Sequence, residues 1–395
     1  MTAGVHARGV HPSKRVVGVD VARGLALLSM MSVHILPELD ARDDLTPAFI
    51  LFAGRASALF ALLAGTGLAL ATGGSAPRLR PWRPVAAALL TRAAIVAAIG
   101  LVLGELSPPV AVILTNYGLL FVVGLAVLAV RPGRLFALAA VWVVATPLLS
   151  HLARTHLPRG PGAQPSLSLL AHPVELARAL TLTGYYPILQ WSAYLLVGVA
   201  VGRLALHRAR TAALLLGVGL TLAVAARLIS DQLLARGGLA ALKAAGPQRL
   251  VPRDETIGHL QLLSQFGVPP TTTWWWQAVA SPHTATPFDL AHTTGSALAV
   301  LGLVLLITRS SARLLRGPVA VLAATGSMTL TLYTAHVLGL AARLGPTDRS
   351  ALLALNVVAV LVLATIWRAT HPRGPLEQLV HQAATSARAR ATPHR

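Results

Sequence analysis

The chain has 395 residues, of which 55% are hydrophobic and only 12% are charged. Soluble domains carry about 25% charged residues, so this composition excludes a water-soluble globular protein and indicates a chain largely surrounded by lipid. A formal net charge of +20 would suggest nucleic-acid binding in a soluble protein, but in a membrane protein such charge lies in loops that face anionic lipid. We therefore expect the lipid bilayer as a partner and no nucleic acid.

Ten stretches of mainly apolar residues predict transmembrane helices, because roughly 20 such residues are needed to cross a hydrocarbon core of about 30 Å. The stretches are 16–37, 48–72, 85–105, 110–130, 134–151, 186–206, 211–234, 290–308, 319–340 and 350–368. Residues 166–184 are too polar to span and predict a surface or re-entrant segment. The expected fold is all-α, a polytopic membrane protein of about ten transmembrane helices.

The charges predict the orientation of these helices. Most arginines fall in alternate connections, such as those at Arg83, Arg134 and Arg210, whereas acidic residues such as Asp40 and Asp254 fall in the others. Cytoplasmic loops are enriched in basic residues, so this alternation predicts that both termini are cytoplasmic and that the protein lies in the cytoplasmic (inner) membrane.

The helix pattern also predicts how the chain is divided. We expect a cytoplasmic N-terminal tail (1–15), one transmembrane domain (16–368) with outer loops at 152–185 and 235–289, and a basic cytoplasmic tail (369–395). There is no cysteine, which excludes disulfides and thiolate metal sites. No carboxylate-rich motif accompanies the histidines, so we expect no metal.

Polar residues follow one face of the first helix. Asp20, Arg23 and His34 fall within a narrow arc at about 100° per residue. Asp20 and Arg23 lie near the inner end and His34 near the outer surface. Ionisable residues inside a membrane are costly and usually have a partner or a function. The alternatives are a structural ion pair that fixes helix packing and an interfacial histidine.

Other polar side chains lie at a similar outer depth. They are Arg55, Asn116, Tyr333 and His336, and the outer loop adds His283. We expect His34, Arg55 and His336 to surround one cavity, although each could instead only bridge helices. The run of tryptophans at 274–276 is typical of the outer interfacial belt, with stacking on a sugar as the alternative.

Several segments resemble the bacterial YeiB-like membrane proteins, which are distantly similar to heparan-alpha-glucosaminide N-acetyltransferase. The segments are GVDVARGLALL (18–28) followed by His34, LFAGRASALFALLAG (51–65), SPHT (281–284), GSALAVLG (295–302), GSMTLTLYTAH (326–336) and RGPLE (373–377). Arg23 followed eleven residues later by His34 also resembles the wider transmembrane acyltransferases, in which the histidine assists acyl transfer.

This resemblance implies a membrane-embedded acyltransferase. The donor would be cytoplasmic acyl-CoA, with acetyl-CoA as the leading candidate, and the acceptor an envelope or extracytoplasmic sugar or glycolipid. The implied catalytic residues are His34, Arg55 and His336; the implied donor-binding residues are Arg23, Asp20 and Arg15; and the implied acceptor-binding residues are His283, Tyr333 and Asn116.

Two other classes of function stay open at this point. A permease or flippase would move protons or a solute along the polar face of the first helix, and broken helices would favour it. A non-catalytic scaffold would leave the residues from Asp20 to His34 without a role. Direct transfer and an acyl-histidine intermediate are both open, and so is the oligomeric state, with a homodimer as one alternative.

Overall fold

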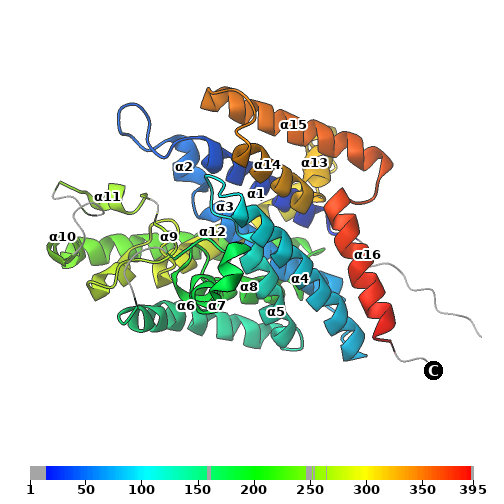
Figure 1. Cartoon of the computed structure of the whole chain (residues 1–395), viewed down its shortest axis with the longest axis horizontal. Coiled ribbons are helices and arrows are strands. Elements are labelled where there is room, and N and C mark those ends of the chain that lie inside the picture. Colours follow the sequence, from blue (N-terminus) through cyan, green and yellow to red (C-terminus); the bar gives the residue numbers. More distant parts are fainter. Residues whose placement is uncertain (1–14, 158–161, 246–250, 252–253, 264, 393–395) are drawn as a thin grey trace, which may run out of the picture.

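The computed structural model describes residues 15–157, 162–245, 251, 254–263 and 265–392. Within these residues the secondary structure is helical, and the one β-type pairing is an isolated bridge between Leu39 and Leu45 (Figure 1). The predicted all-α class is therefore confirmed. The predicted N-terminal tail falls outside the described residues except for Arg15, and its placement stays a prediction.

Seven helices are long and apolar enough to cross a membrane, which confirms a multi-pass membrane protein. They are α1 (Val17–Ile35), the pair α2 (Pro47–Phe52) and α3 (Arg55–Ala71), α4 (Trp82–Glu105), α6 (Pro132–Arg154), α9 (Ala209–Leu233), α12 (Pro287–Ile307) and α15 (Arg349–Thr370). An eighth span results if α13 (Arg313–Gly326) and α14 (Thr329–Ala341), which meet at a bend of 73°, are taken together.

The other helices are shorter. Two are apolar, α5 (Leu114–Val127) and α8 (Ile188–Gly202). The rest are η1 (Ser168–Ala171), α7 (Pro173–Arg178), η2 (Ala179–Thr183), η3 (Leu234–Gly238), α10 (Leu239–Ala245), α11 (Ile257–Leu260), η4 (Trp274–Ala278) and α16 (Pro375–Arg390). The polar segment 166–184 is thus a series of short helical turns.

Each of the ten predicted stretches overlaps one of the apolar helices or helix pairs, but only seven or eight of these are long enough to span a membrane. The exception that matters most is α8. Its 15 residues rise about 22 Å at 1.5 Å per residue, less than a hydrocarbon core. All of them except Leu189 are buried, so α8 is a core helix surrounded by others rather than a lipid-facing one.

Close backbone packing of α3 against α8 fixes the centre of the bundle. A Cβ at Gly198 would lie 2.0 Å from the carbonyl oxygen of Leu62, and a Cβ at Gly65 would lie 2.4 Å from that of Leu195. Thr66 adds a hydrogen bond from its hydroxyl to the carbonyl of Gly198 at 3.1 Å. Small residues permit such close contact between helices in membranes, and here they hold α3 in place beneath the cavity described below.

Two helix breaks shape the rest of the structure. The first separates α2 from α3 at Gly54, whose φ of 70° lies in the left-handed region that glycine tolerates. The second separates α13 from α14 at Ser327 and Met328. It lies beside α16, which packs along α4 at the right of Figure 1.

The segments of the predicted loop 235–289 gather at the end of the molecule opposite α16. Figure 1 shows α10 and α11 at the left and the C-terminus at the right. A second apolar cluster joins Leu234, Leu242, Leu260 and Trp276 there. Trp276 is fully buried, whereas Trp274 is half exposed. The tryptophan run is therefore not a uniform interfacial belt, because Trp276 packs inside the loop cluster.

Candidate functional site

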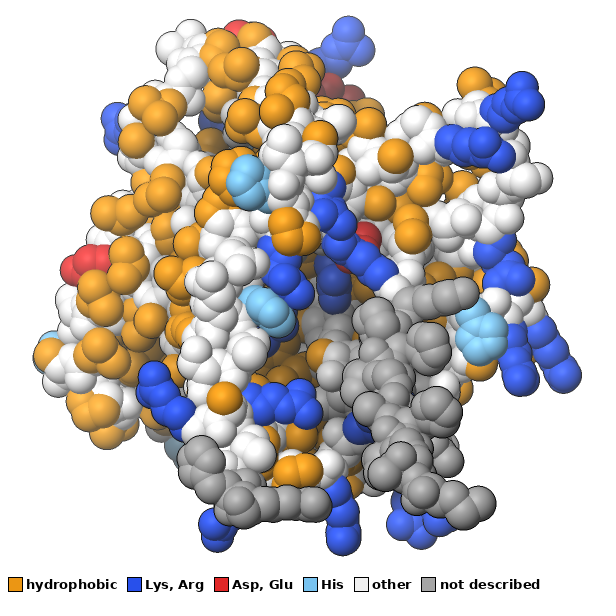
Figure 2. Space-filling model, turned by 90° about the vertical axis from the view of Figure 1, so that its right-hand side faces the viewer, with side chains coloured by type: hydrophobic (Ala, Val, Ile, Leu, Met, Phe, Trp, Pro, Cys, Tyr) orange, Lys and Arg blue, Asp and Glu red, His pale blue; other side chains and the backbone are white. Residues whose placement is uncertain are grey.

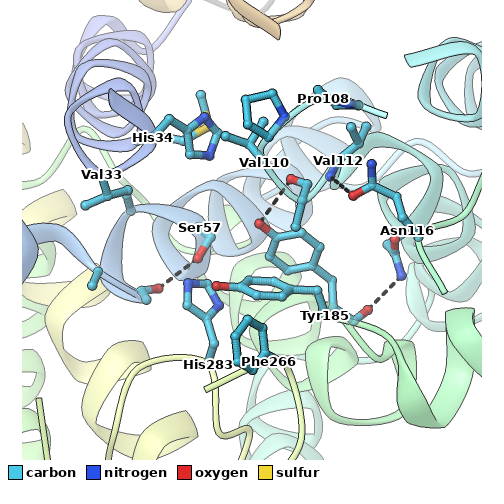
Figure 3. A pocket seen from close by; sticks show the side chains of 18 of the residues that line it. Val33, His34, Ser57, Pro108, Val110, Val112, Asn116, Tyr185, Phe266 and His283 are labelled. Carbon is cyan, nitrogen blue, oxygen red and sulfur yellow. Dashed lines mark hydrogen bonds between the residues drawn. The ribbon is translucent and has the colours of Figure 1, made fainter. Parts of the chain in front are cut away.

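A cavity of about 680 Å³ opens beside the C-terminal end of α1, the end predicted to be the outer one. Its walls come from the last turns of α1, the α2–α3 break, residues 107–112 before α5, residues 162–165, Tyr185 and Tyr186, and the loop residues Phe266 and His283. Figure 3 shows His34 on one side of the cavity and His283 and Phe266 on another. The Gly54 break allows this arrangement, since a Cβ at Gly54 would lie 3.2 Å from Pro282, next to His283.

Two of the three predicted catalytic residues meet at the wall of this cavity. Nδ1 of His34 lies 3.3 Å from Nε2 of His336, and the two rings stack at an interplanar angle of 12°. Nδ1 of His336 lies 3.1 Å from Oδ1 of Asn356 on α15. His34 lines the cavity, and His336 stands behind it and is buried.

The third predicted catalytic residue, Arg55, points elsewhere. Its Nη2 donates to Nε2 of His292 at 2.9 Å, and its Nη1 donates to the carbonyl of Ile50 at 2.6 Å. Nδ1 of His292 in turn donates to the carbonyl of Ala223 at 2.9 Å. Arg55 is not among the residues that line the cavity. The expectation of one cavity for all three residues therefore needs correction, because Arg55 ties the α2–α3 break to α12.

Of the three predicted acceptor-binding residues, Asn116 and His283 line the cavity. Asn116 donates from Nδ2 to the carbonyl of Tyr186 at 2.8 Å, and its buried Oδ1 has no hydrogen-bond partner within the described structure. Tyr333 lies outside the lining, and its hydroxyl accepts the N–H of Ile113 at 3.3 Å at the start of α5. Tyr333 thus joins α14 to the segment that forms one wall.

His283 is surrounded by aromatic rings. Its ring centroid lies 4.6 Å from that of Tyr185 and 5.9 Å from that of Tyr186. His283 belongs to the loop between η4 and α12, outside the helices long enough to span a membrane. Burial lowers the pKa of this imidazole from 6.5 to about 4, so His283 is neutral at physiological pH.

The predicted donor-binding residues form one ion cluster at the N-terminal end of α1. The buried carboxylate of Asp20 accepts hydrogen bonds from Nε of Arg15 at 2.5 Å and from Nη1 of Arg23 at 3.3 Å. Asp20 and Arg23 therefore form an ion pair, which also agrees with the alternative in which this pair only fixes helix packing. Figure 2 shows lysine and arginine side chains gathered around a hollow on the face that carries α16.

Two known protein families match separate parts of the chain. Residues 15–240 match the catalytic region of heparan-alpha-glucosaminide N-acetyltransferase, which covers more than half of the chain. The chain belongs to this N-acetyltransferase family. Residues 260–387 match a second family, described as DUF418, a protein of unknown function, and this match confirms the resemblance to YeiB-like proteins. No curated protein matches the chain.

The cavity of this N-acetyltransferase-family protein is built from both matched regions. Of the lining residues, His34 and Asn116 come from the first region and Phe266 and His283 from the second, which also supplies His336 and Asn356 behind His34. The family supports an N-acetyltransferase type of activity in a membrane and implies acetyl-CoA as donor. In the described residues no group of three or more His, Cys, Asp or Glu side chains is placed to hold a metal ion.

Some residues of the site were not predicted. Tyr185 and Phe266 line the cavity from loops whose position depends on tertiary packing. Gln164 accepts the N–H of Val112 at 3.1 Å and thereby joins two of the walls. Asn356 did carry a signal, since it is an amide within the apolar stretch 350–368 and polar residues inside membranes are usually functional.

Proposed function

We propose that this protein is an acyltransferase of the cytoplasmic membrane. It moves an acetyl or other short acyl group from cytoplasmic acyl-CoA to a hydroxyl or amine of a sugar or glycolipid at the outer side. The observation that carries the proposal is the stacked pair of His34 and His336 at the wall of the outer cavity, in a chain whose family is named for an N-acetyltransferase.

The topology that goes with this activity has all ten apolar segments in the membrane and both termini in the cytoplasm. Three features support it. The basic side chains gather on the face of α16 (Figure 2), whereas α10 and α11 lie at the opposite end (Figure 1). His34 lies in the last turn of α1, and Asp20 lies in the first. Donor and acceptor would therefore approach the bundle from opposite ends.

The inner end of α1 offers a binding site for the phosphates of the donor. Arg23 is partly exposed and Arg15 is about half exposed, although both contact Asp20. Charge-assisted hydrogen bonds from arginine to phosphate are among the strongest in proteins. We expect Arg23 and Arg15 to contact these phosphates while Asp20 holds the two guanidinium groups in place.

At the outer end, His34 acts as the general base. It takes the proton from the acceptor hydroxyl or amine as that group attacks the thioester carbonyl carbon. The new C–O or C–N bond forms, the C–S bond breaks, and the CoA thiolate leaves and is then protonated. Asn116 and His283 line the same cavity and are placed to hydrogen-bond the acceptor. Arg55 acts as a positioning residue that fixes the α2–α3 break through His292.

Two variants separate donor binding from chemistry. Arg23→Ala should weaken acetyl-CoA binding in calorimetry, and the exposed Arg83→Ala should not. His34→Ala should bind acetyl-CoA like wild type but transfer no labelled acetyl group to a membrane extract, because loss of a general base affects the transition state more than the ground state. The exposed His172→Ala is its control. Thermal unfolding must be measured in parallel, since Arg23→Ala leaves Asp20 with one partner fewer.

A transporter is the second candidate, because broken helices are typical of transporters and α13 and α14 meet at 73°. The same experiment distinguishes the two. Wild-type protein that is well folded but binds no acetyl-CoA would reject the acyltransferase and favour transport. Transfer by His34→Ala would keep the enzyme but assign the base to another residue.

A further inference from the structure

We propose that Asn356 is a positioning residue that sets the tautomers of His336 and His34, so that Nε2 of His34 presents a lone pair to the outer cavity. The inference rests on the proposed acyl transfer for its functional meaning. The tautomers themselves follow from hydrogen bonds that the structure shows, and they can be measured without any transfer assay.

The orientation of the Asn356 amide comes first. Nδ2 of Asn356 donates to the carbonyl oxygen of Leu352, one turn earlier on α15, at 2.9 Å. The other amide atom, Oδ1, therefore faces Nδ1 of His336 at 3.1 Å. An amide oxygen can only accept a hydrogen bond. Nδ1 of His336 must consequently carry the proton.

The second step passes from one ring to the next. A neutral imidazole has one N–H and one acceptor nitrogen, so His336 with its proton on Nδ1 is an acceptor at Nε2. That atom lies 3.3 Å from Nδ1 of His34, which must then be the donor. Nε2 of His34 is left unprotonated, as a general base requires. When His34 takes a second proton, it keeps its hydrogen bond to His336.

The position of Asn356 on α15 indicates that its side chain has a function. α15 is the least buried of the apolar helices long enough to span a membrane, and Leu355 and Val358 are more than half exposed. A buried or lipid-facing amide is costly unless its hydrogen bonds are made. Seven residues earlier, on the same face of the helix, Arg349 donates to the carbonyl of Ile35 at 3.0 Å. These two contacts of α15, one direct and one through His336, thus support the end of α1 that carries His34.

The chemical logic is that of a nucleophile or base oriented through a second and a third group. An asparagine in the third position fixes the tautomer without a negative charge. This suits a site at the edge of the hydrocarbon region, where an unpaired carboxylate would be costly. A purely structural role for Asn356 would instead be that of an interhelical hydrogen bond.

The direct test is ¹⁵N solid-state NMR of histidine-labelled protein in lipid bilayers, with signals assigned by loss in His34→Gln and His336→Gln. In wild type, both rings should be protonated on Nδ1 and unprotonated on Nε2. Asn356→Leu should lose this state at both rings, and Asn356→Asp, which keeps an acceptor oxygen, should retain it. Thr365→Leu is the matched control, because the hydroxyl of Thr365 contacts only its own helix and is exposed.

Kinetics give a second readout. Asn356→Leu should lower kcat by about tenfold, the factor that follows from ~1.4 kcal/mol, with the affinity for acetyl-CoA unchanged, and Asn356→Asp should restore most of the rate. A proton on Nε2 of His34 in wild type, or full activity of a folded Asn356→Leu protein, would overturn the inference. Nδ1 protonation of both rings in a wild-type protein that transfers no acetyl group would refute the proposed function and leave the tautomers standing.

Discussion

The hydroxyl of Thr331, in the first turn of α14, donates a hydrogen bond to Oε2 of Glu377 on α16 at 2.6 Å. Oε1 of the same carboxylate accepts the N–H groups of Leu330 at 2.7 Å and Thr331 at 3.2 Å. The first N–H groups of a helix have no partner within it, so Glu377 caps α14 from α16. Since α14 carries His336 two turns later, the C-terminal helix helps to hold the histidine pair in place.

The first prediction concerns this cap. Glu377→Ala should lower the free energy of unfolding by about 2 kcal/mol, the upper end of the range for lost helix caps, because two N–H groups and a hydroxyl lose their acceptor. Thermal unfolding in detergent is the measurement. Glu377→Gln keeps one acceptor oxygen and should lose less. An unchanged unfolding midpoint in Glu377→Ala would mean that α14 does not depend on the cap.

The second prediction concerns the contact between α1 and α13. A Cβ at Gly326 would lie 1.7 Å from the carbonyl oxygen of Asp20, so Gly326→Ala must push the two helices apart. We expect a loss of about 1 to 3 kcal/mol, the usual cost of overpacking. The control is Gly339→Ala on α14, where a Cβ would meet nothing within 4 Å. That variant should be neutral or slightly more stable, because alanine favours helix. Equal thermal midpoints for the two variants would contradict the packing.

Hydrophobic runs predicted where the helices lie but not how each one ends. Residues 319–340 form one mainly apolar stretch, yet the chain bends by 73° between Gly326 and Thr329. The bend depends on contacts from Asp20 and Glu377, which are far away in the sequence. In the same way, α8 is apolar enough for a span although its length and burial make it a core helix. Hydropathy alone does not distinguish lipid from protein as the apolar neighbour.

Depth along a helix was sufficient to predict which site residues meet in one case, the histidine pair, but not in the other, Arg55. His34 in the last turn of α1 and His336 in the second half of α14 were predicted to have similar depths, and they meet. Arg55 lies at a similar depth, but its direction was set by a histidine 237 residues away, which no local pattern reveals. Helix packing decides on which side of a helix a polar group meets its partner. The sequence of a single helix does not reveal that packing.

The third prediction concerns topology. Reporter fusions after Arg83, Arg134, Arg210 and Arg316 should report the cytoplasm, because these positions follow basic inner connections. Fusions within 38–47 and 240–285 should report the outer side. Fusions on the two sides of α8 control for its short length. Two reversed signals among these positions would reject the ten-segment arrangement.

The last prediction concerns acid sensitivity at His283. Burial among Tyr185 and Tyr186 lowers the pKa of this imidazole from 6.5 to about 4. The unfolded chain therefore binds more protons than the folded protein between these values, so the contribution of His283 to stability is complete above pH 6.5 and decreases as the pH falls toward 4.

His283→Asn removes the titrating group, and asparagine tolerates the backbone φ of 60° at this position. Between pH 6.5 and pH 5, wild type should lose about 1.5 kcal/mol more stability than His283→Asn, as measured by thermal unfolding in detergent. The exposed His172→Asn should follow wild type. Parallel pH profiles for wild type and His283→Asn would show that His283 is hydrated and titrates normally in the folded protein.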